Sequence, residues 1–172
     1  MRLASCPQSE AGDIMTFLIA GPLDPAAELA SFEDRVGDAG AIVTFTGRVR
    51  AASGLGNVTS LFLQSHPILT AQGIGNAIDT AHARWPLTAS LVRHRIGELG
   101  VHDPIVFVAT AARHRRAAFL AADFLMDYLK TEAVFWKKEV TATGTAWVEP
   151  KDTDYADKAR WNNKTEKNEC TE

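Results

Sequence analysis

Two lysines flank an aromatic stretch near the end of this 172-residue chain. Lys130 lies five residues before the pair Phe135 and Trp136, and Lys137 directly follows that pair. Between residues 113 and 139 there are six Lys/Arg and four Asp/Glu, a local charge of +2 in a chain with a net charge of −3. Such a cluster suits an anionic ligand. It also suits a reactive amine, because neighbouring cations lower the pKa of a lysine.

The chemistry of these lysines depends on which side chains share a face. A strand over residues 135–140 places Lys137 and Glu139 on one face and Lys138 on the other, because successive side chains alternate. Lys130 falls at the C-terminal end of an expected helix, where the helix dipole favours a cation. The plainer interpretation is that Lys130 only caps this dipole and that Lys137 is a solvated strand lysine.

Two other basic segments are candidates for binding an anion. His114 and Arg115 lie just before the expected helix, where free backbone N–H groups can meet an anion. The planar guanidinium of arginine suits phosphate or carboxylate. Arg48 and Arg50 follow an expected strand and precede a glycine-bearing loop. A solvated helix start and an ordinary charged edge strand are the respective alternatives.

Composition limits the class of protein. With 46% hydrophobic and 23% charged residues, the chain is typical of a single globular domain. The slight negative charge argues against a general nucleic-acid binder. No apolar run is long enough to span a membrane, and no signal peptide is recognisable, so we expect no membrane association and a cytoplasmic location.

The cysteines lie only at the ends of the chain, at Cys6 and Cys170. We interpret them as free thiols of a reduced cytosolic protein. No Cys/His spacing resembles a metal site, so we expect neither a metal nor a cofactor. We divide the chain into a variable N-terminal extension (1–14), a single catalytic domain (15–161) and a disordered tail (162–172).

Helix and strand patterns alternate through the body of the chain. Strands are expected at 40–47, 58–64, 91–99 and 105–110, helices at 67–85 and 117–130, and a closing hairpin at 134–140 and 145–148. A mobile loop is expected at 51–57. On the second helix we expect one buried side, formed by Phe119, Leu125 or Met126, and Leu129. Antiparallel strand runs with two substantial helices predict an α+β fold.

Several of these segments, in this order, resemble the large, catalytic subunit of molybdopterin synthase over roughly residues 35–161. The matching stretches are Gly40-Ala-Ile-Val-Thr-Phe-Thr-Gly-Arg-Val-Arg50, Arg84-Trp-Pro-Leu87, His94-Arg-Ile-Gly-Glu-Leu99, Phe124-Leu-Met-Asp-Tyr-Leu-Lys130, Phe135-Trp-Lys-Lys-Glu139 and Trp147-Val-Glu149. The resemblance implies a mixed, mainly antiparallel sheet with two main helices and a small β-subdomain of the α/β hammerhead type.

The resemblance also implies a sulfur transfer in molybdenum cofactor biosynthesis. The family converts cyclic pyranopterin monophosphate into molybdopterin by installing a dithiolene. The sulfur arrives as a thiocarboxylate at the C-terminal Gly-Gly of a small ubiquitin-like carrier subunit. The catalytic subunit is a homodimer, which forms a heterotetramer with two carriers. This implication agrees with the lack of an internal cysteine, because the partner supplies the sulfur.

Site residues follow from the resemblance by position. The two catalytic lysines fall on Lys130 and Lys137. The substrate-binding and pocket positions fall on Arg48, Val49, Arg50, His114, Arg115, Lys138, Glu139, Phe45, Met126 and Lys151. We expect Lys130 beside the incoming thiocarboxylate and Lys137 on the pterin side.

The chain departs from the family pattern at some positions. Gln64-Ser65-His66-Pro67 stands where relatives often show Glu-His-Tyr-Pro, and Lys151 stands where an arginine is usual. The alternative from a different class is a non-catalytic anion- or nucleotide-binding relative that keeps the fold. RNA binding is disfavoured by the net charge and by the lack of an aromatic stacking motif.

Overall fold

The computed structural model describes residues 17–54 and 56–162. The expected N-terminal extension, both cysteines and the tail beyond residue 162 lie outside the described residues. The division of the chain into extension, catalytic domain and tail therefore stays a prediction.

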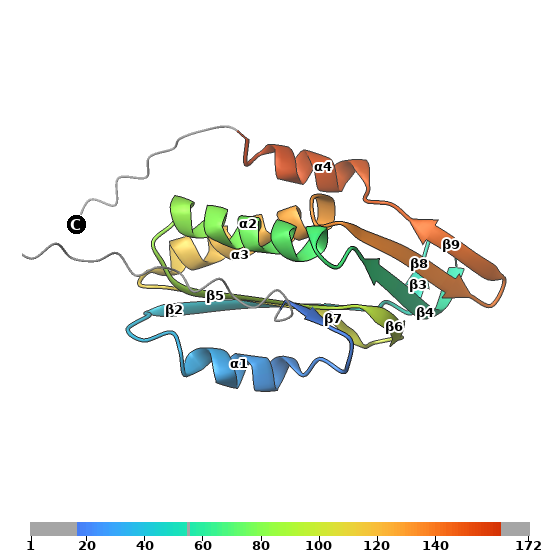
Figure 1. Ribbon diagram of the computed structural model, residues 1–172, viewed down its shortest axis with the longest axis horizontal. Coiled ribbons are helices and arrows are strands. Elements are labelled where there is room, and N and C mark those ends of the chain that lie inside the picture. Colours follow the sequence, from blue (N-terminus) through green and yellow to red (C-terminus); the bar gives the residue numbers. More distant parts are fainter. Residues whose placement is uncertain (1–16, 55, 163–172) are drawn as a thin grey trace, which may run out of the picture.

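Four strands form the first sheet, in the order β1-β5-β7-β2 (Figure 1). They are β1 (Leu18–Ile19), β5 (Leu87–Arg95), β7 (Pro104–Ala112) and β2 (Ala41–Arg48). β1 pairs with β5 in parallel, and the other two pairings are antiparallel. The seven consecutive buried residues at the end of β7 identify this strand as the middle of the domain.

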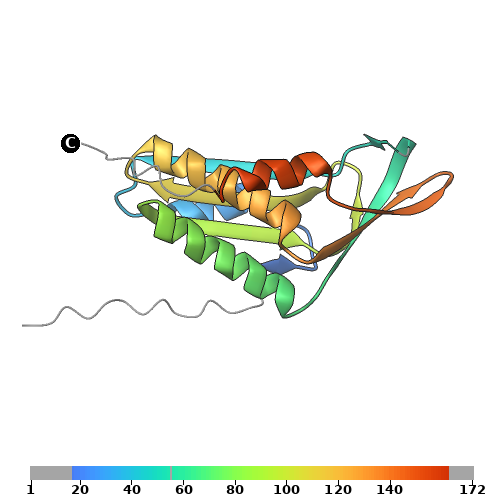
Figure 2. The ribbon, with the colours of Figure 1, turned by 90° about the horizontal axis from the view of Figure 1, so that it is seen from above.

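A second sheet, of five strands, projects from one end of the first (Figures 1 and 2). Its strands are β3 (Ala52–Ser53), β4 (Gly56–Ser65), β6 (Gly97–Gly100), β8 (Phe135–Thr141) and β9 (Gly144–Val148). β4 pairs with β3, β6 and β8, and β8 also pairs with β9, all antiparallel. The second sheet has its own core of Val49, Val58, Leu61, Leu63 and Leu99.

Four helices accompany the sheets. They are α1 (Pro25–Glu33), α2 (Leu69–Arg84), α3 (Arg115–Thr131) and α4 (Asp152–Ala159). α2 and α3 cover one face of the first sheet, α1 covers the other, and α4 lies on the outer side of α3 (Figure 1). Within the described ranges, no helix is long and apolar enough to cross a membrane.

The predicted α+β class with mainly antiparallel strands is confirmed. Three details of the prediction are wrong: two concern the segments 91–99 and 51–57, and the third concerns the buried side of α3. The segment 91–99 is not one strand, because Gly97 at φ +87° lets the chain turn from β5 into β6 of the other sheet. The segment 51–57 is not only a loop, because it contains β3 and the start of β4. The elements β1, α1 and α4 were not predicted.

The third error concerns the buried side of α3. Its core residues are Ala118, Ala121, Ala122, Phe124, Leu125 and Leu129. Leu125 and Leu129 are confirmed, but the ring of Phe119 is 60% exposed. Phe119 follows Ala118 by one residue, about 100° around the helix, and so lies off the buried stripe.

Substitutions on α3 test this orientation. We expect Leu125→Ala to lower the free energy of unfolding by about 2–5 kcal/mol, because it leaves a cavity in a fully buried cluster. Phe119→Ala serves as the control and should change it by about 0.5 kcal/mol or less, as is usual at the surface. Urea unfolding at constant m-value measures both. A larger loss from Phe119→Ala than from Leu125→Ala would contradict the orientation.

Candidate active site

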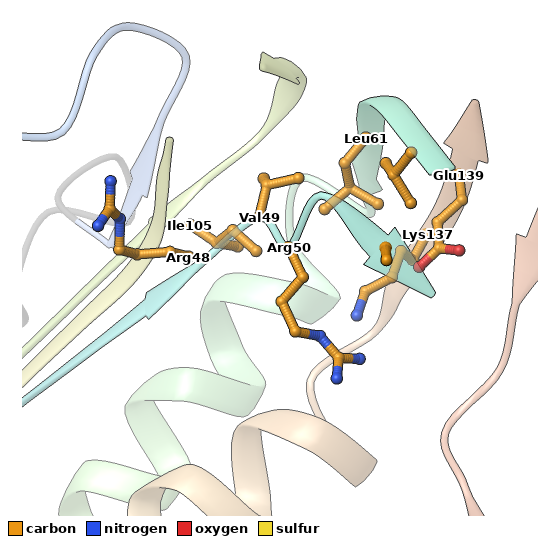
Figure 3. A pocket seen from close by; sticks show the side chains of 9 residues that line it. Arg48, Val49, Arg50, Leu61, Ile105, Lys137 and Glu139 are labelled. Atoms are coloured by element: carbon orange, nitrogen blue, oxygen red, sulfur yellow. The ribbon is translucent and has the colours of Figure 1, made fainter. Parts of the chain in front are cut away.

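A small cationic pocket lies where the two sheets meet (Figure 3). It has a volume of about 60 Å³. Arg50 and Lys137 extend into the same space, and the carboxylate of Glu139 lies beside Lys137. The alternation expected for residues 135–140 is therefore present, with Lys137 and Glu139 on one face of β8.

Backbone hydrogen bonds fix the segment that carries Arg50. The pairing of β2 with β7 shifts register between Gly47 and Arg48. Val49, which is buried, then donates its N–H to the carbonyl oxygen of Asp103 at 3.0 Å and accepts the N–H of His102 at 2.9 Å. These two bonds fix the backbone just before Arg50, and so fix the point from which the arginine side chain extends.

Lys137 is held in a central strand, since Leu63 and Val148 are its register partners on either side. Burial lowers the pKa of its amine, and the positive charges of Lys130 and Arg50 lower it further. Glu139 and Asp154 act in the opposite direction. Lys137 is therefore more readily deprotonated than an ordinary lysine.

Lys130 belongs to the last turn of α3, as the sequence predicts. Its Nζ donates to Oδ1 of Asp154 at 3.0 Å. Asp154 lies in the first turn of α4 and was missed by the sequence analysis. Acidic residues at Asp152 and Asp154 are typical of a helix start and were the available signal.

A buried histidine, His94, packs against the face of β8 that carries Phe135 and Lys137. The ring of His94 stacks on Phe135 with centroids 3.9 Å apart. Its Nδ1 lies 2.8 Å from the carbonyl oxygen of Arg95, which can only accept, so Nδ1 carries the proton. Burial lowers the pKa of His94 to about 4, and Lys137 contributes to the lowering. At neutral pH His94 therefore adds no charge to the site.

Some predicted site residues point away from the pocket. Arg48 is at its rim, but its guanidinium turns away from Arg50 (Figure 3), and its Nε donates to the carbonyl oxygen of His102 at 2.7 Å. Lys138 lies on the opposite face of β8, with Nζ 5.3 Å from the ring centroid of Phe62 and 5.6 Å from that of Trp147. The geometry of one chain gives Lys138 no contact with the pocket.

His114 and Arg115 lie far from the lysines. His114 is the N-cap of α3 and Arg115 is its first residue, and both are exposed. Lys130 is fifteen residues further along the same helix, which is about 22 Å at the usual helical rise. One chain therefore does not combine these residues with Lys130 into a single anion site. Lys151 is the N-cap of α4 and is exposed.

An apolar cavity of about 390 Å³ lies between β2 and α3. Phe45 and Met126, predicted as apolar pocket positions, both line it, together with the exposed ring of Phe119. Met126 precedes Lys130 by four residues, one turn along the same face of α3. Lys130 itself is not among the residues that line the cavity.

No group of three or more potential metal ligands occurs within residues 17–54 and 56–162. The charged groups that surround Lys137 are Lys130, Arg50, Glu139 and Asp154. This arrangement can bind an anion, donate a proton from an ammonium and accept one on the amine of Lys137.

Known proteins are similar to this chain over most of its length. The molybdopterin synthase catalytic subunit of Cereibacter sphaeroides is 49% identical over 142 residues, which cover 83% of this chain and 96% of that protein. A solved MoaE protein from Burkholderia ambifaria is 39% identical, with a TM-score of 0.72 over 86% of this chain and 97% of that one.

A second solved structure shares the fold at low sequence identity. It comes from Helicobacter pylori and is described as a protein–protein complex of subunits 1 and 2 of molybdopterin-converting factor. It is 17% identical, with a TM-score of 0.67 over 77% of this chain and 88% of that one. The family model described as MoaE protein matches residues 18–132. This chain belongs to the MoaE protein family.

Proposed function

We propose that this chain is the catalytic subunit of a molybdopterin synthase. It transfers sulfur from the C-terminal thiocarboxylate of a small ubiquitin-like carrier to cyclic pyranopterin monophosphate. The observation that carries the proposal is that Lys130 and Arg50 lie close enough to Lys137 for their charges to lower its pKa, with Met126 of the apolar cavity one helical turn before Lys130. A binding module for phosphate needs the arginine but has no use for a lysine with a lowered pKa.

The apolar cavity is the proposed channel for the carrier's C-terminal tail. A tail that lies along Phe45 and Met126 brings its terminal thiocarboxylate to Lys130, one helical turn further on. Glycines at the end of such a tail suit a narrow channel, because they have no side chains. The charged end then meets a cation, whereas the rest of the tail meets apolar surface.

A second copy of the chain is proposed to complete the substrate site. The cationic pocket of about 60 Å³ is well below the roughly 300–1,000 Å³ of ordinary small-molecule sites. His114 and Arg115 lie too far from Lys137 to serve the same site of one chain. In a homodimer, and in a heterotetramer with two carriers, these residues of one copy serve the lysines of the other. We place the assembly in the cytoplasm.

Replacing the lysines tests the proposed reaction. We expect Lys130→Ala and Lys137→Ala each to slow dithiolene formation by about 10²–10⁴-fold, the usual range for loss of a general acid or base. The assay combines the protein, a thiocarboxylated carrier and the cyclic pterin.

Lys138→Ala is the matched control, because it removes the neighbouring lysine on the opposite face of β8. Its rate should stay within a few-fold of the parent chain. Full activity of both Lys130→Ala and Lys137→Ala would contradict the proposed roles of the two lysines and favour the anion-binding alternative.

The titration of Lys137 should show its lowered pKa. Competitive acetylation followed by mass spectrometry across pH should place the midpoint for Lys137 below the ordinary 10.5. Arg50→Ala should move the midpoint up, because a neighbouring cation is removed. Glu139→Gln should move it down, because a neighbouring anion is removed. A midpoint at 10.5 that neither variant moves would refute the electrostatic description of the pocket.

A charge in the apolar cavity tests the proposed channel. We expect Met126→Lys to weaken binding of the carrier by about tenfold, because a lysine in the channel has to be desolvated when the tail enters. Met126→Leu conserves volume and should bind normally. Calorimetry with a carrier that lacks its last four residues provides the control. A penalty of equal size with the shortened carrier would show that the cavity does not receive the tail.

A further inference from the structure

The carboxylate of Asp154 is held in place more firmly than the lysine it contacts. Oδ1 accepts from Nζ of Lys130 at 3.0 Å, and Oδ2 accepts from the backbone N–H of Lys151 at 2.9 Å. The side chain of Asp154 is 16% exposed, whereas that of Lys130 is 57% exposed. The aspartate is the better-anchored partner of this pair, and its hydrogen bond restrains the ammonium of the long lysine side chain.

Asp154 also stays ionised. Desolvation by itself would raise its pKa, but the hydrogen bonds from Lys151 and Lys130 and the charges of Lys130 and Lys137 lower it. The negative charge opposite the two lysines is therefore present at neutral pH.

The helix that carries Asp154, α4, has no buried face. None of the residues Asp152–Ala159 is buried. An eight-residue helix of this kind has little stability in isolation, so its position depends on its contacts with the rest of the domain.

Those contacts are concentrated at the C-terminal end of α4, where Lys158 pairs with Glu132, and just beyond it. Arg160 pairs with Asp127 at 2.7 Å and with Asp123 at 2.8 Å. The indole N–H of Trp161 donates to the same oxygen of Asp127 at 2.7 Å, and its ring packs edge-on against Trp85 and Phe124. α4 is thus anchored at one end and presents Asp154 to Lys130 at the other.

We infer that Asp154 is a positioning residue of the site, which holds the ammonium of Lys130 in a fixed place next to Lys137. This inference rests on the proposed function, since it assigns the two lysines different parts in that reaction. Lys130, paired with a carboxylate, is the stationary cation that meets the anionic end of the carrier. Lys137, which has no hydrogen-bonded acid in the described part of the chain, is the proton acceptor.

The charges that face Lys137 come from four elements. Lys130 at the end of α3 and Arg50 after β2 disfavour its ammonium, whereas Glu139 on β8 and Asp154 on α4 favour it. The adjacent His94 on β5 is neutral at physiological pH because burial lowers its pKa to about 4. Removing the charge of Asp154 therefore lowers the pKa of Lys137 still further and releases Lys130 at the same time.

Asp154→Asn is the test variant, and Asp157→Asn is its matched control. Asp157 belongs to the same helix and is exposed, so its replacement removes the same charge without touching the lysines. Two readouts are needed: the pH–rate profile of dithiolene formation, and the titration of Lys137 by NMR of lysine labelled with ¹³C at Cε. The full chain and its carrier are used in the first.

For Asp154→Asn we expect kcat to fall about tenfold. We also expect the titration midpoint of Lys137 to move to lower pH, and the part of the pH–rate profile that depends on Lys137 to move with it. Asp154→Glu keeps the charge but displaces it by one methylene. It should restore the Lys137 titration while kcat recovers only in part. Asp157→Asn should match the parent chain in both readouts.

The inference is overturned if Asp154→Asn keeps the parent kcat and the parent Lys137 titration. It is also overturned if kcat falls while the titration stays in place, since Asp154 would then only cap α4. The NMR titration needs no turnover. An inactive parent chain, tested with a carrier that works with another synthase, would therefore reject the proposed function. The effect of Asp154 on Lys137 would still be tested by the NMR titration.

Discussion

Three positive charges, those of Lys130, Lys137 and Arg50, are held near one another at the junction of the two sheets, and like charges repel. Much of the architecture around them opposes that repulsion. β8 is hydrogen-bonded on both sides, so Lys137 has no backbone freedom. The buried Val49 is tied to residues 102 and 103, which fixes the backbone next to Arg50. The carboxylates of Glu139 and Asp154 compensate part of the charge, and the burial of His94 keeps a further cation from forming.

The part of the site that lies on regular elements was predictable from the sequence. Alternation along 135–140 placed Lys137 beside Glu139 and Lys138 on the other face, because a strand has a strict period of two. The helix pattern placed Lys130 in the last turn of α3 in the same way. Phe119 shows the limit of such patterns, since a helix register that is wrong by one residue moves a side chain by about 100°.

Other parts were not predictable because their physical cause lies outside the local sequence. α4 has no buried side, so hydrophobic periodicity does not reveal it, and Asp154 was missed with it. β1 has two residues and exists only through its pairing with β5. His114 and Arg115 were assigned to the site by their match to family positions, but a match by position does not say whether they lie near Lys130 in one chain. Only the length of α3 shows that they belong to a different end of the molecule from Lys130.

In the proposed homodimer, that length would have a genetic consequence. Because α3 carries one cationic group at each end, a two-fold dimer that joins the N-terminal end of one copy to the lysines of the other builds every site from two polypeptides. A chain damaged at Arg115 and a chain damaged at Lys137 would then form a mixed dimer with one doubly defective site and one intact site. Two inactive alleles could complement each other inside a single assembly, whereas two alleles damaged at the same end could not.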